Sequence, residues 1–148
     1  MNSEDQYKAI IDTNLIISAL IVEHSLPFQL LQAWENQKFT LLISPELLDE
    51  IKEVLGREEL KKKYHFSTDK INSLLISLRS AAELVRSLPY EDLPFHCRDP
   101  KDNILLAAVF GGEASHLITG DKDILVLKEK AHLKGLHIVT VREFLSLP

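Results

Sequence analysis

Short apolar runs alternate along the chain with longer segments whose apolar residues recur at helical spacing. The short runs predict strands, because a few consecutive apolar residues between turn signals suit a strand that is buried on both faces. The predicted strands cover residues 7–11, 39–43, 116–119 and 138–141, and residues 83–87 are a candidate for another.

Helices are predicted between these strands. Ser44 has the side chain of an N-cap, Pro45 suits a first helical turn, and Gly56 marks an end. Gly111 and Gly112 predict the end of another helix. The predicted helices cover residues 15–21, 26–34, 44–55, 67–82, 99–110, 122–127 and 142–147, with a charged connector or short helix at 57–66 and a loop at 88–98.

The alternation of strands and helices predicts the fold class. A strand that is followed by a helix and then by a parallel strand builds a sheet with helices on its faces, through right-handed connections. We therefore expect an α/β protein, a three-layer α/β/α sandwich with a mainly parallel central sheet. At 148 residues, a single domain over residues 1–148 is expected.

The amino-acid composition excludes several classes of protein and of site. Cys97 is the sole cysteine, which excludes an internal disulfide and a cysteine-based metal cluster. The longest nearly apolar run, residues 15–22, is less than half of the roughly 20 residues that span a bilayer. Residues 1–6 are polar and acidic, unlike a secretory signal. We expect a cytoplasmic protein without a membrane partner.

Four acidic residues from distant segments are expected at one edge of the sheet. Asp12 ends the first predicted strand, and Asp121 follows the strand at 116–119. Glu50 and Asp102 lie on helices that begin just after strand exits. Carboxylates gathered in this way repel one another unless a cation is bound, and Mg²⁺ or Mn²⁺ prefers such oxygen ligands. The arrangement suits metal-assisted hydrolysis of a phosphodiester.

Each acid also has a purely structural interpretation. Asp12, Asp121 and Asp123 could be helix caps or turn residues. Asp99 before Pro100 is better explained as an N-cap than as a ligand, whereas capping does not require Asp102. Around Glu50, the core stripe of the predicted helix favours Glu50 as the acid nearest to the packed face. Glu46 is then the fallback, and Asp49 and Glu53 point to solvent.

The order of these segments resembles that of the PIN-domain nucleases over nearly the whole chain. The matching segments are Ile11-Asp12-Thr13-Asn14, Ser44-Pro45-Glu46-Leu47-Leu48-Asp49-Glu50, Asp99-Pro100-Lys101-Asp102-Asn103 and Ile118-Thr119-Gly120-Asp121-Lys122-Asp123. The resemblance implies that Asp12, Glu50, Asp102 and Asp121 hold Mg²⁺ or Mn²⁺ and are catalytic. It gives Asp123 an accessory role, and implies that Asn14 and Thr119 orient the acids or the bound water.

The likeness is greatest to the prokaryotic branch of toxins from toxin–antitoxin pairs. It implies an endoribonuclease, a homodimer, and an antitoxin that covers the active-site groove. Two alternatives remain open: an RNA-processing nuclease without a toxin role, and a catalytically silent binding module on the same fold. A receiver-type domain and an Asp-x-Asp phosphatase are disfavoured, because the additional acid that each requires is missing.

The formal charge of −5 at first argues against a nucleic-acid substrate. Setting aside six candidate or neighbouring acids from the 22 acidic residues leaves 16, against 17 basic residues. Arg98, Lys101 and Lys122 flank the expected site and are candidates for substrate binding. The basic run around residues 57–66 is better explained as a solvated helix end, and His96 beside Cys97 lacks the partners of a zinc site.

Overall fold

Five parallel strands form the central sheet in the computed structural model, which describes residues 6–148. Their spatial order is β3-β2-β1-β4-β5. The strands are β1 (Lys8–Ile11), β2 (Thr40–Ile43), β3 (Glu83–Leu84), β4 (His116–Ile118) and β5 (His137–Val139). The predicted α/β class and parallel sheet are confirmed. β3 is the shortest strand, at two residues within the candidate range 83–87.

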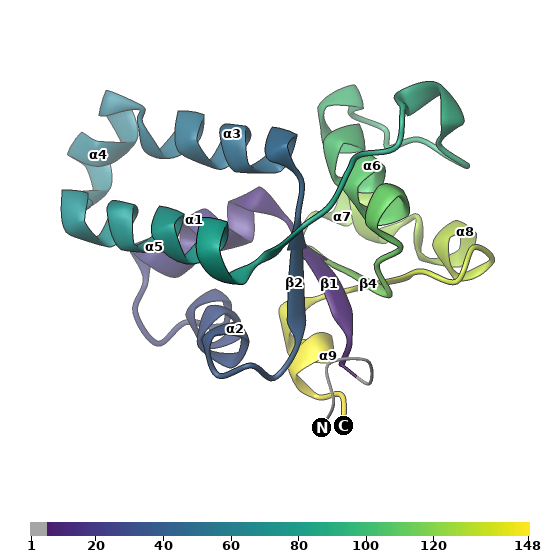
Figure 1. Ribbon diagram of the computed structural model, residues 1–148, viewed down its shortest axis with the longest axis horizontal. Helices are drawn as coiled ribbons and strands as arrows, with labels where there is room; N and C mark the ends of the chain where they lie inside the picture. The colour runs from purple at the N-terminus through teal and green to yellow at the C-terminus, as the bar shows by residue number, and fades with distance from the viewer. Residues whose placement is uncertain (1–5) are drawn as a thin grey trace.

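Helices flank the sheet and complete the sandwich (Figure 1). α6 packs on β1, β2 and β4, while α7 and α8 contact β5. Figure 1 shows these three helices on one side of the strands and α1, α2 and α5 on the other. The helices are α1 (Thr13–Ile21), α2 (Leu26–Glu35), α3 (Pro45–Leu55), α4 (Glu58–Tyr64), α5 (Thr68–Ala81), α6 (Asn103–Gly112), α7 (Lys122–Leu125), α8 (Lys128–His132) and α9 (Val141–Leu145).

The centre of the sheet is apolar on both faces, as expected of a parallel sheet covered by helices. Ala9 and Ile10 of β1 and Leu117 of β4 are fully buried. In α6, Ala107 and Ala108 are also fully buried, and their small side chains let this helix lie close to the strands. β1 and β4 are therefore held firmly side by side, and the loops that follow them start from fixed positions.

Two adjoining helices, α1 and α2, lie on the other side of the strands from α6 (Figure 1). α1 and α2 pack against each other, and α2 also contacts α9. No single helix in residues 6–148 has the length and apolar content to cross a membrane. α1 and α2 meet those criteria only when they are counted together across a 102° bend.

Some predicted boundaries were wrong. Residues 128–132 form α8, where no helix was expected, and a 3₁₀ turn at Tyr90–Asp92 interrupts the predicted loop. The helix expected from Asp99 begins instead as a 3₁₀ turn, η3 (Pro100–Asp102), and becomes α-helical at Asn103. The capping at Ser44 is confirmed, since its side chain accepts a hydrogen bond from the Leu47 N–H at 3.1 Å.

Gly111 and Gly112 were expected to end a helix, and α6 does end at Gly112. Glu113 follows as the C-cap residue, in the left-handed conformation with φ 55°. The glycines are required by close packing. A Cβ on Gly111 would lie 1.9 Å from the Arg86 carbonyl oxygen, and a Cβ on Gly112 would lie 2.9 Å from Cγ1 of Val85. The chain after β3 thus crosses α6 at the glycine pair.

We predict that Gly111→Ala destabilises the protein by roughly 2–3 kcal/mol, because the added methyl forces the backbone crossing apart. Gly120→Ala is the matched control, since nothing lies within 4 Å of a Cβ at that position. Its effect should stay within about 0.5 kcal/mol. Urea unfolding of the three proteins measures both changes. Equal stability of Gly111→Ala and the parent would contradict the packing assigned to this glycine.

Candidate metal-binding active site

The candidate site begins at the point where the sheet reverses its strand order. β1 lies between β2 and β4: the chain passes from β1 to β2 and β3 on one side and then crosses to β4 and β5 on the other. Such switch points open a crevice at the carboxyl ends of the strands, where α/β proteins bind ligands. Ile11 pairs with Ile118, and the Asp12 N–H donates to the Ile118 carbonyl at 2.9 Å. Asp12 therefore sits directly beside Thr119.

Thr119 links the two acids that follow these strands. Its hydroxyl donates to Oδ2 of Asp12 at 2.7 Å and accepts a hydrogen bond from the Asp121 N–H at 3.1 Å. Thr119 is fully buried, so this hydroxyl makes its bonds away from water. The arrangement fixes the Asp12 carboxylate and the turn that carries Asp121 relative to each other.

Asp12 is an unusually buried acid, with 5% of its surface exposed. Its Oδ1 accepts a hydrogen bond from the backbone N–H of Asn14 at 3.1 Å, so it also caps α1. The capping interpretation and the site interpretation thus hold for the same side chain. Burial raises the pKa of Asp12 more than these hydrogen bonds lower it, and the charge of Asp121 raises it further. Asn14 is exposed and contributes its backbone.

Glu50 is the acid of α3 that faces this edge. It is half-buried, whereas Glu46, Asp49 and Glu53 are exposed. The hydroxyl of Thr13, the first residue of α1, donates to Oε2 of Glu50 at 3.1 Å. Glu50 is thereby tied to the residue next to Asp12, although 37 positions separate it from Thr13 in the sequence.

Asp102 ends the η3 turn and is half-buried. Burial is the largest cause that raises its pKa, to about 6, and nearby negative charges raise it further. Those charges belong to the other candidate acids: Asp121, Asp12, Asp99 and Glu50. The structure therefore brings the four predicted acids into one shared electrostatic field. Asp99 is exposed, and its Oδ1 accepts from the Lys101 N–H at 3.0 Å, as a cap does.

Two residues near the acids were missed from the sequence. Thr13 was not among the predicted site residues, yet its hydroxyl contacts Glu50. Asn103 is buried, and its Oδ1 accepts from the Cys97 N–H at 2.8 Å, which holds the loop before α6. Burial and the acids raise the pKa of the Cys97 thiol to about 12, so it remains protonated.

The oxygen ligands of the four acids and the repulsion between their charges both favour binding of a hard cation. Burial and mutual repulsion both disfavour their charged forms, and a divalent cation would relieve both effects. Their side chains are close but not yet in a coordination geometry. Among residues 6–148, no three His, Cys, Asp or Glu side chains stand together at ligating positions. Binding a cation among these acids would therefore require their side chains to rearrange.

Comparison with known proteins identifies the family. A family model described as PIN domain matches residues 8–123. The chain belongs to the PIN-domain family. It is also 31% identical over 144 residues to the uncharacterized protein MJ1680 of Methanocaldococcus jannaschii, which covers 94% of this chain and 90% of that protein. PIN domains are generally nucleases and generally use divalent metals such as Mg²⁺.

Three basic side chains lie at the rim of this PIN domain's acidic site. Nη1 of Arg98 is 3.7 Å from Oδ1 of Asp123, and both side chains are largely exposed. The Asp123 N–H donates to Oδ1 of Asp121 at 2.9 Å, so Asp121 caps α7. Lys101 and Lys122 are exposed on the adjoining turns. These basic side chains can therefore reach a bound anion without becoming buried themselves.

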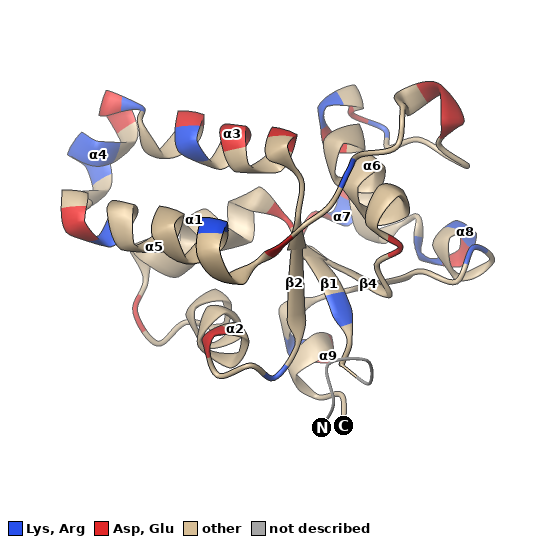
Figure 2. Cartoon of the chain, in the orientation of Figure 1, with Lys and Arg blue, Asp and Glu red and all other residues tan. Residues whose placement is uncertain are grey.

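The other basic segment of the PIN domain lies away from the strands. α4 lies at the far end of α3 and α5 in Figure 1, and Figure 2 shows both signs of charge on α3 and α4 but none on β2. Arg57, at the N-cap position of α4, pairs with Glu53 at 2.8 Å. Nζ of Lys63 lies 5.2 Å from the centre of the Tyr64 ring.

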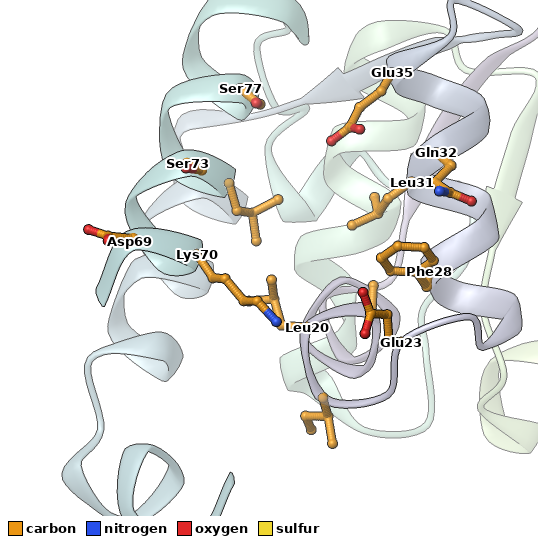
Figure 3. A pocket seen from close by; sticks show the side chains of 13 residues that line it. Leu20, Glu23, Phe28, Leu31, Gln32, Glu35, Asp69, Lys70, Ser73 and Ser77 are labelled. Atoms are coloured by element: carbon orange, nitrogen blue, oxygen red, sulfur yellow. The ribbon is translucent and has the colours of Figure 1, made fainter. Parts of the chain in front are cut away.

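A groove of about 480 Å³ lies between α1, α2 and α5, and it contains none of the four acids. Figure 3 shows Phe28 and Leu31 of α2 on one side and Lys70 and Ser73 of α5 on the other. Trp34 of α2 is buried in the core, whereas Phe28 is half-buried at this groove. The groove is thus a separate feature from the acidic site.

We predict that Asp102→Asn stabilises the cation-free PIN domain at pH 8. The pKa of Asp102 is raised from 3.8 to about 6, so its carboxylate is unfavourable once it is charged. The penalty is absent at or below pH 4, grows as the pH rises through 6, and is removed by Asn. We expect a gain of about 1 kcal/mol after discounting for solvent screening.

Thermal unfolding in EDTA at pH 4 and pH 8 measures this gain. Asp49→Asn is the control, because Asp49 is an exposed acid on α3 and should change little at either pH. A lower melting temperature of Asp102→Asn at pH 8 would show that Asp102 is not in a repulsive field.

Proposed function

We propose that this PIN domain is a Mg²⁺- or Mn²⁺-dependent endoribonuclease whose acids are Asp12, Glu50, Asp102 and Asp121. The observation that supports it best is the Thr119 hydroxyl, which contacts Asp12 at 2.7 Å and the Asp121 backbone at 3.1 Å. It joins two acids at the switch point of the sheet. The raised pKa of Asp102, to about 6, ties Asp102 to the same group of charges.

In this proposal the four acids hold the cation, and the rest of the site keeps them in place. A bound divalent cation supplies a water of lowered pKa and a positive charge beside the phosphate. Thr119 and the Asn14 N–H hold the two oxygens of Asp12, while Thr13 holds one oxygen of Glu50. Asp123 has an accessory part, because its N–H fixes Oδ1 of Asp121.

Arg98, Lys101 and Lys122 would bind the phosphates on either side of the cleaved bond. Their exposure and their place at the rim support this role. Contacts to phosphates position a strand without reading its sequence. RNA is proposed as the substrate because of the likeness to the ribonuclease branch of the PIN domains. The proposed reaction is hydrolysis within the RNA chain.

The biological setting is proposed from the same likeness. The protein would be a cytoplasmic toxin that acts as a homodimer and is inhibited by an antitoxin over its acidic site. An RNA-processing nuclease without a toxin role has the same chemistry, and a silent binding module has the same fold without the chemistry. Measured cleavage separates the third case from the first two, and growth experiments separate the first from the second.

We expect Asp12→Asn and Asp102→Asn to lower RNA cleavage by roughly 100-fold or more, because several kcal/mol of transition-state stabilisation depend on the cation. Cleavage of a labelled RNA is measured with Mg²⁺, with Mn²⁺ and with EDTA. Asp49→Asn is the matched control, since Asp49 is an exposed acid on the same helix as Glu50. If both site variants stay folded and cut RNA as fast as the parent, the catalytic assignment is wrong.

For the toxin role, we expect induced expression to arrest growth and Asp12→Asn to abolish the arrest. Co-expression of the product of the neighbouring gene should restore growth with the parent protein. Colony counts and RNA profiles measure the outcome. Normal growth at a high level of active enzyme would favour the RNA-processing alternative.

A further inference from the structure

We propose that Thr13 is a positioning residue that sets the carboxylate of Glu50 beside Asp12. This inference rests on the proposed function, because it concerns how the acids of that site are held. It assigns a role to a side chain that lies between two motif residues and carries no charge of its own. Thr13 would influence the site only by orienting the Glu50 carboxylate.

Thr13 is the buried partner in the hydrogen bond with Glu50. Thr13 is 5% exposed, and its hydroxyl donates to Oε2 of Glu50 at 3.1 Å. A buried hydroxyl needs a partner, and a charged acceptor makes the stronger hydrogen bond. The bond joins the start of α1 to the second turn of α3, two helices that pack against each other. It therefore fixes Glu50 to the strand end that carries Asp12.

The position of the Glu50 carboxylate depends on its hydrogen bond with Thr13. Among residues 6–148, Thr13 is the side chain that hydrogen-bonds Glu50, and the ion pairs found there do not include this acid. A glutamate has three rotatable bonds, and ordering its side chain costs entropy. One oxygen held by Thr13 leaves Oε1 available to a cation.

A purely structural role for the Thr13 hydroxyl explains less. The cap of α1 is the Asp12 side chain, so the hydroxyl of Thr13 is not needed to start the helix. Packing between α1 and α3 needs the shape of the side chain, which valine reproduces. The remaining property of threonine is the hydrogen bond, and that bond is directed at one acid.

The test compares Thr13→Val, which keeps the shape, with Thr13→Ser, which keeps the hydroxyl. Titration calorimetry of the full chain with Mn²⁺ measures the affinity of each. Loss of a group that orients a ligand costs roughly 10-fold in metal affinity, so we expect about that loss for Thr13→Val. Thr13→Ser should stay within about 3-fold of the parent. Thr13→Ala is a second variant without the hydroxyl, in case valine disturbs the fold.

Glu50→Gln completes a double-mutant cycle. If Thr13 acts through Glu50, adding Thr13→Val to Glu50→Gln should weaken Mn²⁺ binding no further. An additive loss, or an unchanged affinity of folded Thr13→Val and Thr13→Ala, would overturn the inference alone. Asp12→Asn tests the site itself. If the parent binds no Mn²⁺, or binds it equally well without the Asp12 carboxylate, the proposed function fails together with the inference.

Discussion

The repulsion between carboxylates at one edge of the sheet is the constraint on which the rest of the structure depends. Asp12 is 5% exposed, and burial and the charge of Asp121 raise its pKa. Asp102 lies in the same field, with its pKa at about 6. A protein gains no stability from such a group by itself. The fold must therefore hold the acids in place with other contacts, and a cation is the natural means of relieving their repulsion.

Those contacts come from two threonines on an apolar scaffold. The fully buried residues of β1, β4 and α6 fix two neighbouring strand ends. Thr119 then holds Asp12 and the turn of Asp121, and Thr13 holds Glu50. Both hydroxyls are buried, so they retain their directions. The basic side chains at the rim stay exposed to solvent, where they can contact the phosphates of a substrate whatever its base sequence.

Much of this could be predicted from the sequence, because parallel strands and their exits have strong local signals. Asp12 directly follows one apolar run and Asp121 comes three residues after the end of another, which placed them at one edge. The helical stripe of α3 singled out Glu50, and the structure leaves Glu46, Asp49 and Glu53 exposed. The α/β class followed from the alternation of elements, and the PIN-domain match agrees with it.

What the sequence could not give depends on contacts between distant segments. The partners of Thr13 and Asn103 are set by tertiary packing, and the close crossing of Gly111 with the chain at Arg86 has no local signature. The central claim is tested most directly by a crystal structure of the protein soaked in Mn²⁺. The account predicts anomalous density between Asp12, Asp102 and Asp121. Density elsewhere, or none there with those side chains turned apart, would contradict it.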